Sequence, residues 1–381
     1  MNIVFVSNYF NHHQRPLSDA LATLSNYTFV ATVPMTEERR TMGWGTEKEP
    51  EYVCHYDQDR DAVIAKLDSA DVVIAGSAPE DLVRRCIQRG KVVFRYAERP
   101  LKNGLEWGKF FPRLLKWHLQ NPWKKPVYML CASAYTAGDY AKFGLFRNKT
   151  IKWGYFPEVK QYASADTMLN QKRANTILWV GRLLDWKHPD DALRVAARLK
   201  ADGFDFQMNI IGNGPLEPKL REEIACWNLE DNVHLLGTMT PHEVRRHMEE
   251  SQVFLFTSDR KEGWGAVLNE AMNSGCAVVA SDAAGATPFL VQDGSNGYVY
   301  PSQNVEELYR KVAGLLSEPN TSKRLGLAAS ETIAGLWNAQ VAAQRFLSIA
   351  EQVCKGHKLE TLFTEGPGSP AEIIREDWYT K

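Results

Sequence analysis

Three things are scarce in this sequence, and each scarcity excludes a class of protein. No apolar run reaches the length that a membrane-spanning helix needs, so no such helix is expected. The 45 lysines and arginines nearly balance the 46 aspartates and glutamates, so the chain has no overall basic field to attract nucleic acid. Only six cysteines are present and no two form a Cys-x-x-Cys pair. We expect them to be reduced residues of a cytoplasmic protein.

What the sequence has instead is a regular alternation of short apolar strands and amphipathic helices over 381 residues. That length predicts two domains, and the alternation predicts parallel α/β sheets, hence two Rossmann-like domains. Strands are expected at residues 3–7, 27–31, 72–75, 92–96 and 127–132, and again at 176–181, 207–212, 233–237, 253–257 and 277–281. Helices are expected at 189–200, 216–227, 241–250, 305–316, 322–336 and 339–354, with one short helix at 371–381.

The boundary between the two domains is expected within residues 153–175, where Gly154 and Pro157 interrupt regular structure. We place the N-terminal domain at residues 1–158 and the C-terminal domain at 172–335. The last helices, from about 338 to 381, are expected to pack back on the N-terminal domain.

The most informative segment of the C-terminal half runs from Glu262 to Glu270. It follows an apolar strand and leads into a helix that ends at Gly275. Gly263 and Gly265 remove side chains from the start of that helix. Bare backbone N–H groups at a helix N-terminus attract an anion such as a phosphate, and two carboxylates beside it would suit a ligand rich in hydroxyls. Alone, the two glutamates would be ordinary solvated helix residues.

Two cations begin the C-terminal half in a similar position. Arg182 and Lys187 follow the apolar strand 176–181, at the end of a strand where ligands bind in such sheets. Arginine grips phosphate oxygens in pairs, and lysine adds a point charge. The alternative is that both are solvated loop cations. Gly212 and Gly214 then shape a turn that would let a ligand approach the backbone.

Taken together, these segments resemble the retaining glycosyltransferases of family 4, which have the GT-B fold and an E-x7-E motif. Arg182 and Lys187, residues 211–215, Glu262 through Glu270, residues 284–288 and residues 293–297 occur in the same order as in that family. The resemblance is strong over about 176–350 and weaker over 1–160. It implies two Rossmann-like domains whose parallel sheets face each other across a cleft, with the donor bound mainly by the C-terminal domain.

The resemblance also implies roles for individual residues. Arg182 and Lys187 would neutralise the diphosphate leaving group, Glu270 would bond the ribose hydroxyls, and Glu262 would position the donor sugar. Donor-binding positions carried over with them are Gly181, Gly212, Gly214, Gly263, Trp264, Gly265, Ala266 and Val267.

The family further implies a retaining, metal-independent hexosyltransferase without a cofactor. The donor would be a nucleotide-diphosphate sugar, with UDP the common nucleotide in the family and GDP a rarer one. The acceptor would be a saccharide or a lipid-linked saccharide in surface polysaccharide or glycan synthesis. Alternatives with the same fold are a nucleotide-sugar epimerase and a non-catalytic nucleotide-sugar-binding homologue.

The N-terminal half departs from the family pattern. Where many relatives carry a Gly-Gly loop after the first strand, this chain has His12, His13 and Gln14. We expect these to face the cleft and hold acceptor hydroxyls or phosphate, or else to be simple loop residues. Two adjacent histidines without a third ligand are poor evidence for a metal. Where relatives often place a histidine after the fourth strand, Glu98 and Arg99 stand instead and are candidates for orienting the acceptor.

A segment rich in cations and aromatic residues runs from residue 99 to residue 125. Such segments bind membrane interfaces or anionic lipid-linked acceptors, and the alternative is a core helix with one solvated face. We expect a cytoplasmic protein with peripheral contact at the inner face of the membrane. The members are Arg99, Lys102, Trp107, Lys109, Phe110, Phe111, Arg113, Lys116, Trp117, Trp123, Lys124 and Lys125.

Overall fold

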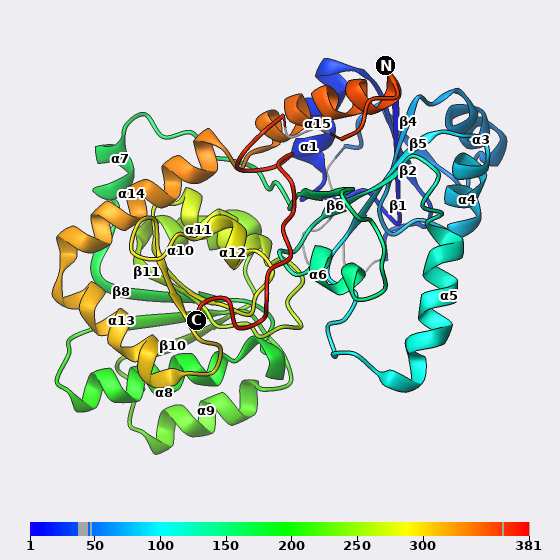
Figure 1. The fold of residues 1–381 in the computed structure, drawn as a ribbon. Coiled ribbons are helices and arrows are strands. Elements are labelled where there is room, and N and C mark those ends of the chain that lie inside the picture. The colour runs from blue at the N-terminus through cyan, green and yellow to red at the C-terminus, as the bar shows by residue number, and fades with distance from the viewer. Residues whose placement is uncertain (37–44, 46–47, 360–361, 381) are drawn as a thin grey trace. The chain divides into compact units, whose positions relative to one another are not determined.

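The computed structural model describes residues 1–36, 45, 48–359 and 362–380, and in it the chain forms two compact units (Figure 1). The N-terminal unit consists of Met1–Glu158 with Trp337–Arg375, and the C-terminal unit of Val159–Leu336 with Glu376–Lys381. None of the helices in the described part of the chain combines the length and apolar character that crossing a membrane requires.

The N-terminal unit is built on a parallel sheet whose strands follow the order β3-β2-β1-β4-β5-β6-β7. The first strand lies inside the sheet, between β2 and β4. Strands β2 and β3 are added on one side of it and strands β4 to β7 on the other. The strands are β1 (Asn2–Ser7), β2 (Asn26–Ala31), β3 (Val53–His55), β4 (Val72–Ala75), β5 (Val92–Ala97), β6 (Val127–Cys131) and β7 (Thr150–Lys152).

Helices of the N-terminal unit follow most of these strands, and the last long helix of the chain returns to pack against the first. They are α1 (Arg15–Leu24), α3 (Arg60–Ser69), α4 (Glu80–Gln88), the 3-10 helix η1 (Trp107–Lys109), α5 (Phe110–Gln120), α6 (Thr136–Ala141) and α15 (Ala339–Cys354). Phe346 of α15 meets Phe94 of β5 edge to face, with ring centroids 4.9 Å apart, which ties the C-terminal helix to the core of this unit.

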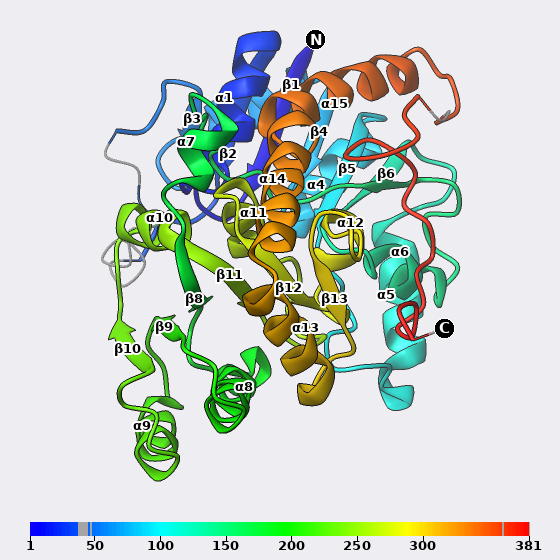
Figure 2. The ribbon, with the colours of Figure 1, turned by 90° about the vertical axis from the view of Figure 1, so that its left-hand side faces the viewer.

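The C-terminal unit has a second parallel sheet, in the order β10-β9-β8-β11-β12-β13 (Figure 2). Its strands are β8 (Arg173–Val180), β9 (Gln207–Ile211), β10 (Val233–Gly237), β11 (Ser251–Phe256), β12 (Ala277–Ser281) and β13 (Tyr298–Tyr300). Residues of β11 and β12 are buried throughout. Strands covered on both faces read as continuous apolar runs, which is why the sequence indicates them clearly.

The helices of the C-terminal unit include two, α8 and α10, whose starts follow the signals expected from sequence. Pro189 opens α8, Pro241 opens α10, and Thr240 closes a capping box with Glu243. The elements are α7 (Ala165–Leu169), η2 (Asp185–Lys187), α8 (Pro189–Ala201), α9 (Glu217–Cys226), α10 (Pro241–Glu250), α11 (Ala266–Asn273), α12 (Thr287–Leu290), α13 (Val305–Ser317) and α14 (Pro319–Gly335).

The fold class predicted from sequence, two Rossmann-like α/β domains with parallel sheets, is confirmed. The short helix expected at 371–381 is wrong: residues 371–380 form turns and irregular structure, and Lys381 lies outside the described residues. The last residues also group with the C-terminal unit, whereas the sequence places 338–381 with the N-terminal one. The reason is side-chain contact, since Trp378 Nε1 donates to the carbonyl of Asp282 and Arg260 pairs with Glu376.

Candidate functional site

The candidate donor site lies at the topological switch point of the C-terminal sheet, where the order of successive strands reverses. Strands β8 and β11 are neighbours in that sheet although two strands separate them in sequence. The loops that leave their carboxyl ends therefore diverge to opposite sides, and ligands of open α/β sheets bind at such a point. These two loops carry Arg182 and Lys187 on one side and Glu262 on the other.

The structure brings two of the predicted catalytic residues together as an ion pair. Lys187 Nζ lies 2.5 Å from Glu262 Oε2, and both side chains are mostly buried, at 15% and 12% exposure. Ser258 Oγ donates to the same carboxylate oxygen at 3.0 Å. A lysine ammonium has three N–H donors, and Glu262 is the only acceptor that Lys187 Nζ meets among the described residues. Lys187 Nζ also lies over the Trp186 ring, 4.7 Å from its centroid, and its N–H groups not bonded to Glu262 can still turn to an anionic ligand.

The backbone around Lys187 is fixed by the end of β11. Thr257 Oγ1 donates to the Lys187 carbonyl at 2.6 Å and accepts from Trp179 Nε1 at 2.8 Å. The Asp259 N–H donates to the Trp186 carbonyl at 2.9 Å. These bonds hold the two loops in one arrangement, so the position of the ammonium is set before any ligand binds.

An additional contact between the same loops involves His188 and Asp259. His188 takes a left-handed conformation, with φ +48°, at the start of α8, and its Nε2 lies 3.5 Å from Asp259 Oδ2. The neighbouring Asp259 carboxylate raises the pKa of His188. Burial opposes ionisation of Asp259, but the nearby His188 ring and a hydrogen bond from the Lys261 N–H hold its pKa below the usual value.

The other cation, Arg182, differs from Lys187 in its surroundings. Its side chain is exposed and makes no ion pair with any described residue. The backbone of its loop is nevertheless fixed, because the Leu183 N–H donates to the Asn213 carbonyl at 2.8 Å. The Arg182 side chain is thus exposed on a fixed loop, whereas the Lys187 ammonium is held by Glu262.

Gly212 allows the turn after β9 to pack closely against the turn after β8. A Cβ at this position would lie 1.9 Å from the Gly181 carbonyl oxygen, and its φ of +132° also favours glycine. Gly214 likewise packs on Leu183. These glycines let the turn after β9 pack on the turn after β8, which supports the Arg182 loop. The space beside Gly212 is therefore filled by the Gly181 backbone and is not open to a ligand.

The start of α11 presents unbonded donors, as the sequence suggests. The N–H groups of Gly265, Ala266 and Val267 donate to no acceptor within the described residues. Gly265 has φ +91°, and a Cβ there would lie 2.3 Å from the Phe256 ring. Trp264, which we expected to take part through its backbone, has a fully buried side chain whose Nε1 donates to Asn269 Oδ1 at 2.8 Å. The indole thus anchors the turn that carries Gly263.

Glu270 lies inside α11, one turn beyond these donors, and is half-buried. Its carbonyl accepts from Ser274 Oγ at 2.8 Å and from Arg245 Nη1 at 3.1 Å. The neighbouring loop after β12 joins the same site, because the Gly285 N–H donates to the Glu262 carbonyl at 3.3 Å. The predicted E-x7-E pair therefore brackets the helix start, with Glu262 in the loop and Glu270 on the helix.

The N-terminal unit holds a polar pocket of about 280 Å³ at its own switch point, beyond the ends of β1, β4 and β5. His13, Gln14 and Glu98, three of the predicted acceptor-side residues, line it. Other lining residues include Asn8, Ser77, Tyr96 and Tyr155. Glu98 accepts from the Tyr155 hydroxyl at 2.9 Å and from Lys102 Nζ at 2.6 Å. Gln14 Oε1 is buried and accepts no bond from the described residues.

His13 is held neutral in this pocket. Burial lowers the pKa of its imidazole to about 4, so at neutral pH the ring carries no charge. It lies against the His12 ring, with centroids 3.9 Å apart. No cluster of three or more metal-ligating side chains occurs in the described part of the chain.

Two predicted acceptor-side residues do not line the pocket. His12 is absent from its wall. Arg99 is buried, at 2% exposure, where its guanidinium pairs with Asp139 at 3.3 Å and lies over the Tyr135 ring. The side chain of Arg99 therefore braces the α6 segment, and an acceptor role for it finds no geometric support.

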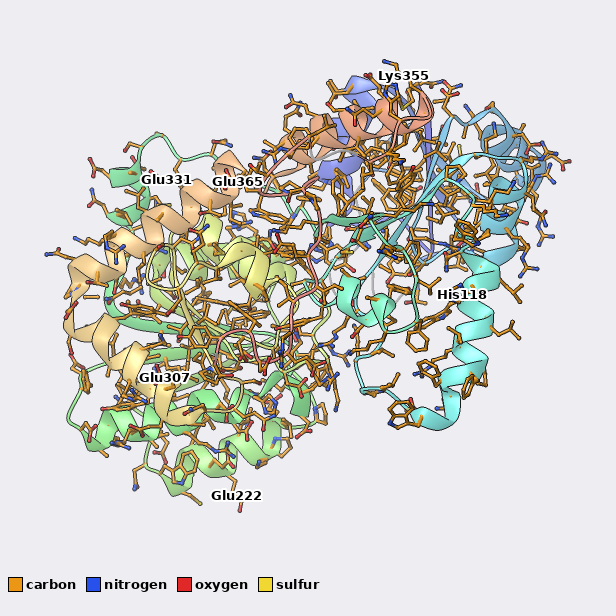
Figure 3. All side chains as sticks on the ribbon, in the orientation of Figure 1. His118, Glu222, Glu307, Glu331, Lys355 and Glu365 are labelled. Atoms are coloured by element: carbon orange, nitrogen blue, oxygen red, sulfur yellow. The ribbon has the colours of Figure 1, made fainter. Side chains whose placement is uncertain are left out.

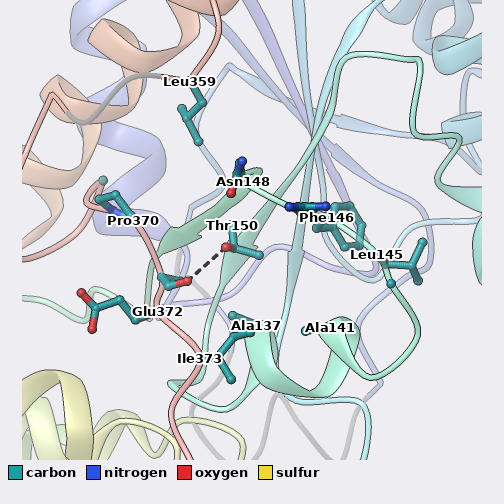
Figure 4. A pocket seen from close by; sticks show the side chains of 14 residues that line it. Ala137, Ala141, Leu145, Phe146, Asn148, Thr150, Leu359, Pro370, Glu372 and Ile373 are labelled. Atoms are coloured by element: carbon teal, nitrogen blue, oxygen red, sulfur yellow. Dashed lines mark hydrogen bonds between the residues drawn. The ribbon is translucent and has the colours of Figure 1, made fainter.

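A larger pocket of about 660 Å³ in the N-terminal unit contains none of the predicted site residues (Figure 4). It lies between the segment from α6 to β7 and the segment around Pro370, where Thr150 Oγ1 donates to the Ala371 carbonyl at 3.1 Å. Sequence reasoning also missed Thr257, Ser258 and Asp259. Three polar residues directly after a buried strand were the signal that points to them.

Comparison with known proteins places these observations in a wider group. Residues 165–332 match the family model for glycosyl transferases group 1. The amylovoran biosynthesis glycosyltransferase AmsK of Erwinia amylovora is 31% identical over 182 residues, which cover 46% of this chain and 44% of AmsK. This chain thus spans about half the length of the curated relatives it matches.

Solved structures match over nearly the whole chain. HepE of Anabaena, crystallised with UDP, superposes with a TM-score of 0.67 at 14% identity, covering 93% of this chain and 99% of HepE. Sucrose-phosphate synthase of Thermosynechococcus elongatus gives a TM-score of 0.67 at 15% identity, with 93% and 99% covered. The whole chain has the GT-B fold, and its C-terminal unit carries the segment typical of glycosyl transferases group 1.

Proposed function

We propose that this protein is a retaining, metal-independent glycosyltransferase of family 4. It moves a sugar from a nucleotide-diphosphate sugar, with UDP as the nucleotide, to a saccharide or lipid-linked saccharide in surface polysaccharide or glycan synthesis. The observation that carries the proposal is the mostly buried Lys187–Glu262 pair at the switch point of the C-terminal sheet. It lies inside the segment that matches the family model.

The charges of the site suit a departing diphosphate. Breaking the bond between sugar and phosphate builds negative charge on the leaving group, and preset cations and bare N–H groups stabilise that charge. In our proposal Lys187 keeps Glu262 as one partner and turns its remaining donors to the phosphates, while Arg182 swings onto them from solvent. Glu270 binds the ribose hydroxyls. Glu262 acts by holding Lys187 as well as by contacting the sugar.

The reaction as proposed needs no separate base. The acceptor hydroxyl attacks from the face that the diphosphate leaves, and its proton passes to the departing phosphate oxygen. The new glycosidic bond and the broken phosphate bond lie on one face, which keeps the anomeric configuration. Positive charge from Arg182 and Lys187 stands where other transferases use a divalent ion, so activity should persist in excess chelator.

For the acceptor we propose the polar pocket of the N-terminal unit. The unbonded Gln14 Oε1 accepts from an acceptor hydroxyl, and neutral His13 offers an uncharged ring to the same group. The names of relatives support a polymer product: AmsK acts in amylovoran biosynthesis. We propose a cytoplasmic enzyme that works peripherally at the inner face of the membrane, where a lipid-linked acceptor would be found.

Nothing in the site favours the two alternatives, a nucleotide-sugar epimerase or a non-catalytic homologue. One experiment separates all three. Thermal unfolding is measured with UDP, GDP and other nucleoside diphosphates, since a ligand at 100 times its Kd stabilises the native state by about 2.7 kcal/mol. Hydrolysis of UDP-sugars without acceptor is then measured for wild type, Arg182→Ala and Lys187→Ala.

We expect UDP to raise the Tm most, and each variant to lose roughly two to three orders of magnitude in turnover. Arg221→Ala, which removes an exposed helix cation paired with Glu217, is the matched control and should turn over normally. UDP binding without any sugar release, even with acceptors supplied, would favour the non-catalytic homologue. Release of free UDP with an epimerised sugar would favour the epimerase.

A further inference from the structure

The outward face of α5 carries an unusual row of exposed apolar side chains, which we call the α5 stripe. It consists of Phe111, Leu115 and Leu119 on α5, with exposures of 75%, 66% and 69%, and of Trp107 in η1 before the helix and Trp123 in the turn after it, each 77% exposed. Residues four apart on a helix are neighbours on one face, so the three α5 residues lie side by side. Among the other described large apolar residues only Ile373, at 66%, is comparably exposed. Contiguous exposed apolar surface marks an interaction site.

The stripe is not needed to hold the helix in place, because the opposite face does that. Phe110 stacks on Phe143 with centroids 4.9 Å apart, and Trp117 meets the same ring at 4.7 Å. Leu114 packs on the core of the unit with them. His118, labelled on α5 in Figure 3, donates from Nε2 to the Phe143 carbonyl at 2.9 Å. Side chains of the stripe can therefore be changed without loosening the fold.

The charges beside the stripe are all positive where they are unpaired. Lys116, Lys124 and Lys125 are exposed and pair with no carboxylate in the described part of the chain. The one acidic residue of the segment, Glu106, is taken by Lys109 at 2.5 Å and Arg113 at 3.1 Å. Glu106 offsets one of the two positive charges of Lys109 and Arg113, and the exposed lysines without a carboxylate partner lie toward the C-terminal end of the segment.

We propose that the α5 stripe inserts into the interface of a membrane containing anionic lipids, with Lys116, Lys124 and Lys125 meeting the headgroups. Tryptophan prefers the depth between acyl chains and headgroups, and Trp107 and Trp123 stand at the two ends of the stripe. Lysine is depleted from the cores of protein interfaces, so the lysines beside this stripe favour a lipid surface over a second copy of the chain. The proposed partner is the membrane surface, and the inference rests on the proposed transfer of sugar to a lipid-linked acceptor.

The test is flotation of the full chain with vesicles. One set contains phosphatidylcholine alone, and the other contains equal parts of phosphatidylcholine and phosphatidylglycerol. We expect wild type to float with the anionic vesicles at low salt and to be released at high salt. The apolar variant combines Phe111→Ser, Leu115→Ser and Leu119→Ser. The charge variant combines Lys116→Gln, Lys124→Gln and Lys125→Gln, and should bind on the order of 100-fold more weakly.

A matched control removes the same charge elsewhere, through Lys66→Gln, Lys355→Gln and Lys358→Gln, all on exposed side chains. It should float like wild type. Circular dichroism and the UDP-induced shift in Tm, measured on every variant, separate loss of fold from loss of binding and test the donor site independently. Wild type that never floats with anionic vesicles overturns the proposal. So does an apolar variant that floats normally, or a dimer in solution that the apolar variant converts to monomer.

Discussion

At the scale of single residues, the two glutamates of the donor site should respond differently to substitution. Glu262 is bound to Lys187 and Ser258, whereas Glu270 stands on α11 beside the bare N–H groups. Glu270→Ala should weaken binding of UDP, because the lost bond is to ribose. Glu262→Gln should leave UDP affinity close to that of wild type, because the amide oxygen can still accept from Lys187, and should lower kcat about 100-fold, because the lost charge acts on the donor sugar that UDP lacks.

Isothermal titration with UDP and steady-state turnover give the two numbers for each variant. Glu217→Gln, on an exposed helix of the same unit, controls for the loss of one carboxylate. If UDP binds to Glu270→Ala as tightly as to wild type, the roles given to the two carboxylates are wrong.

Burial of His13 should make the free energy of unfolding depend on pH. Its pKa is lowered by burial from the ordinary 6.5 to about 4, so between these values the unfolded chain binds a proton that the folded chain does not. Stability contributed at this position is therefore present above pH 6.5 and is lost as the pH falls toward 4. The loss is at most about 3 kcal/mol, and less because part of the ring stays accessible.

Chemical unfolding of wild type and His13→Gln at several pH values measures this loss. The wild-type free energy of unfolding should fall more steeply with acid than that of the variant, which has no titrating ring. His242→Gln, at an exposed helix position, should keep the wild-type slope. Parallel curves for wild type and His13→Gln would mean that the ring is protonated as easily in the folded state as in the unfolded one.

The sequence allowed the types and local positions of these residues to be predicted, but not their contacts with distant residues. Residue types at the ends of apolar strands made Lys187 and Glu262 candidates, because the type of a side chain and its place after a strand are local properties. Their ion pair was not predictable, since it depends on β8 and β11 being neighbours across 75 positions of sequence. The burial of Arg99 was not predictable for the same reason, since its partner Asp139 lies 40 residues further on.

At the scale of elements, the turn after β9 should be more sensitive than other glycine turns. Gly212→Ala brings a Cβ against the Gly181 carbonyl, while Gly203→Ala, at φ +78°, meets nothing within 4 Å. Both variants carry the cost of a positive φ, which is about 1 kcal/mol or somewhat more. Only Gly212→Ala must also push the β8 turn, and with it Arg182, out of place.

We therefore expect Gly212→Ala to lower the Tm clearly more than Gly203→Ala does, and to weaken UDP binding as well. Differential scanning calorimetry with and without UDP measures both effects. Equal Tm losses in the two variants would show that the turns after β8 and β9 adjust freely and that the contact does not fix the Arg182 loop.

Element prediction from sequence succeeded where burial was continuous and failed where elements were short. The helix α15 was predicted at its observed bounds, and buried strands such as β11 and β12 were found from their apolar runs. The three strands that were missed, β3, β7 and β13, have three residues each and lie at or near the edges of the sheets. Three residues carry too little pattern to be told from a loop. The helix expected after residue 370 is absent because its side chains make tertiary contacts in place of helical ones.

At the scale of the whole molecule, the proposed reaction has an outcome that no single residue sets, which is the anomeric configuration of the product. A transferase that inverts needs a base opposite the leaving group to take the acceptor proton. In the donor site the loop carboxylate, Glu262, is already held by Lys187 and Ser258, so its charge is committed on the side of the diphosphate. We expect the leaving phosphate to take the proton and the donor configuration to be kept.

The coupling between H1 and H2 in the NMR spectrum of fresh product, compared with that of the donor, tests whether the configuration is kept. The same sugar supplied as free hemiacetal, whose two anomers equilibrate in water, shows which signal belongs to which anomer. A product with the opposite anomer would show that a base acts from the far face. Arg182 and Lys187 would then remain donor-binding residues of an inverting enzyme, and only the assignment to a retaining family would fall.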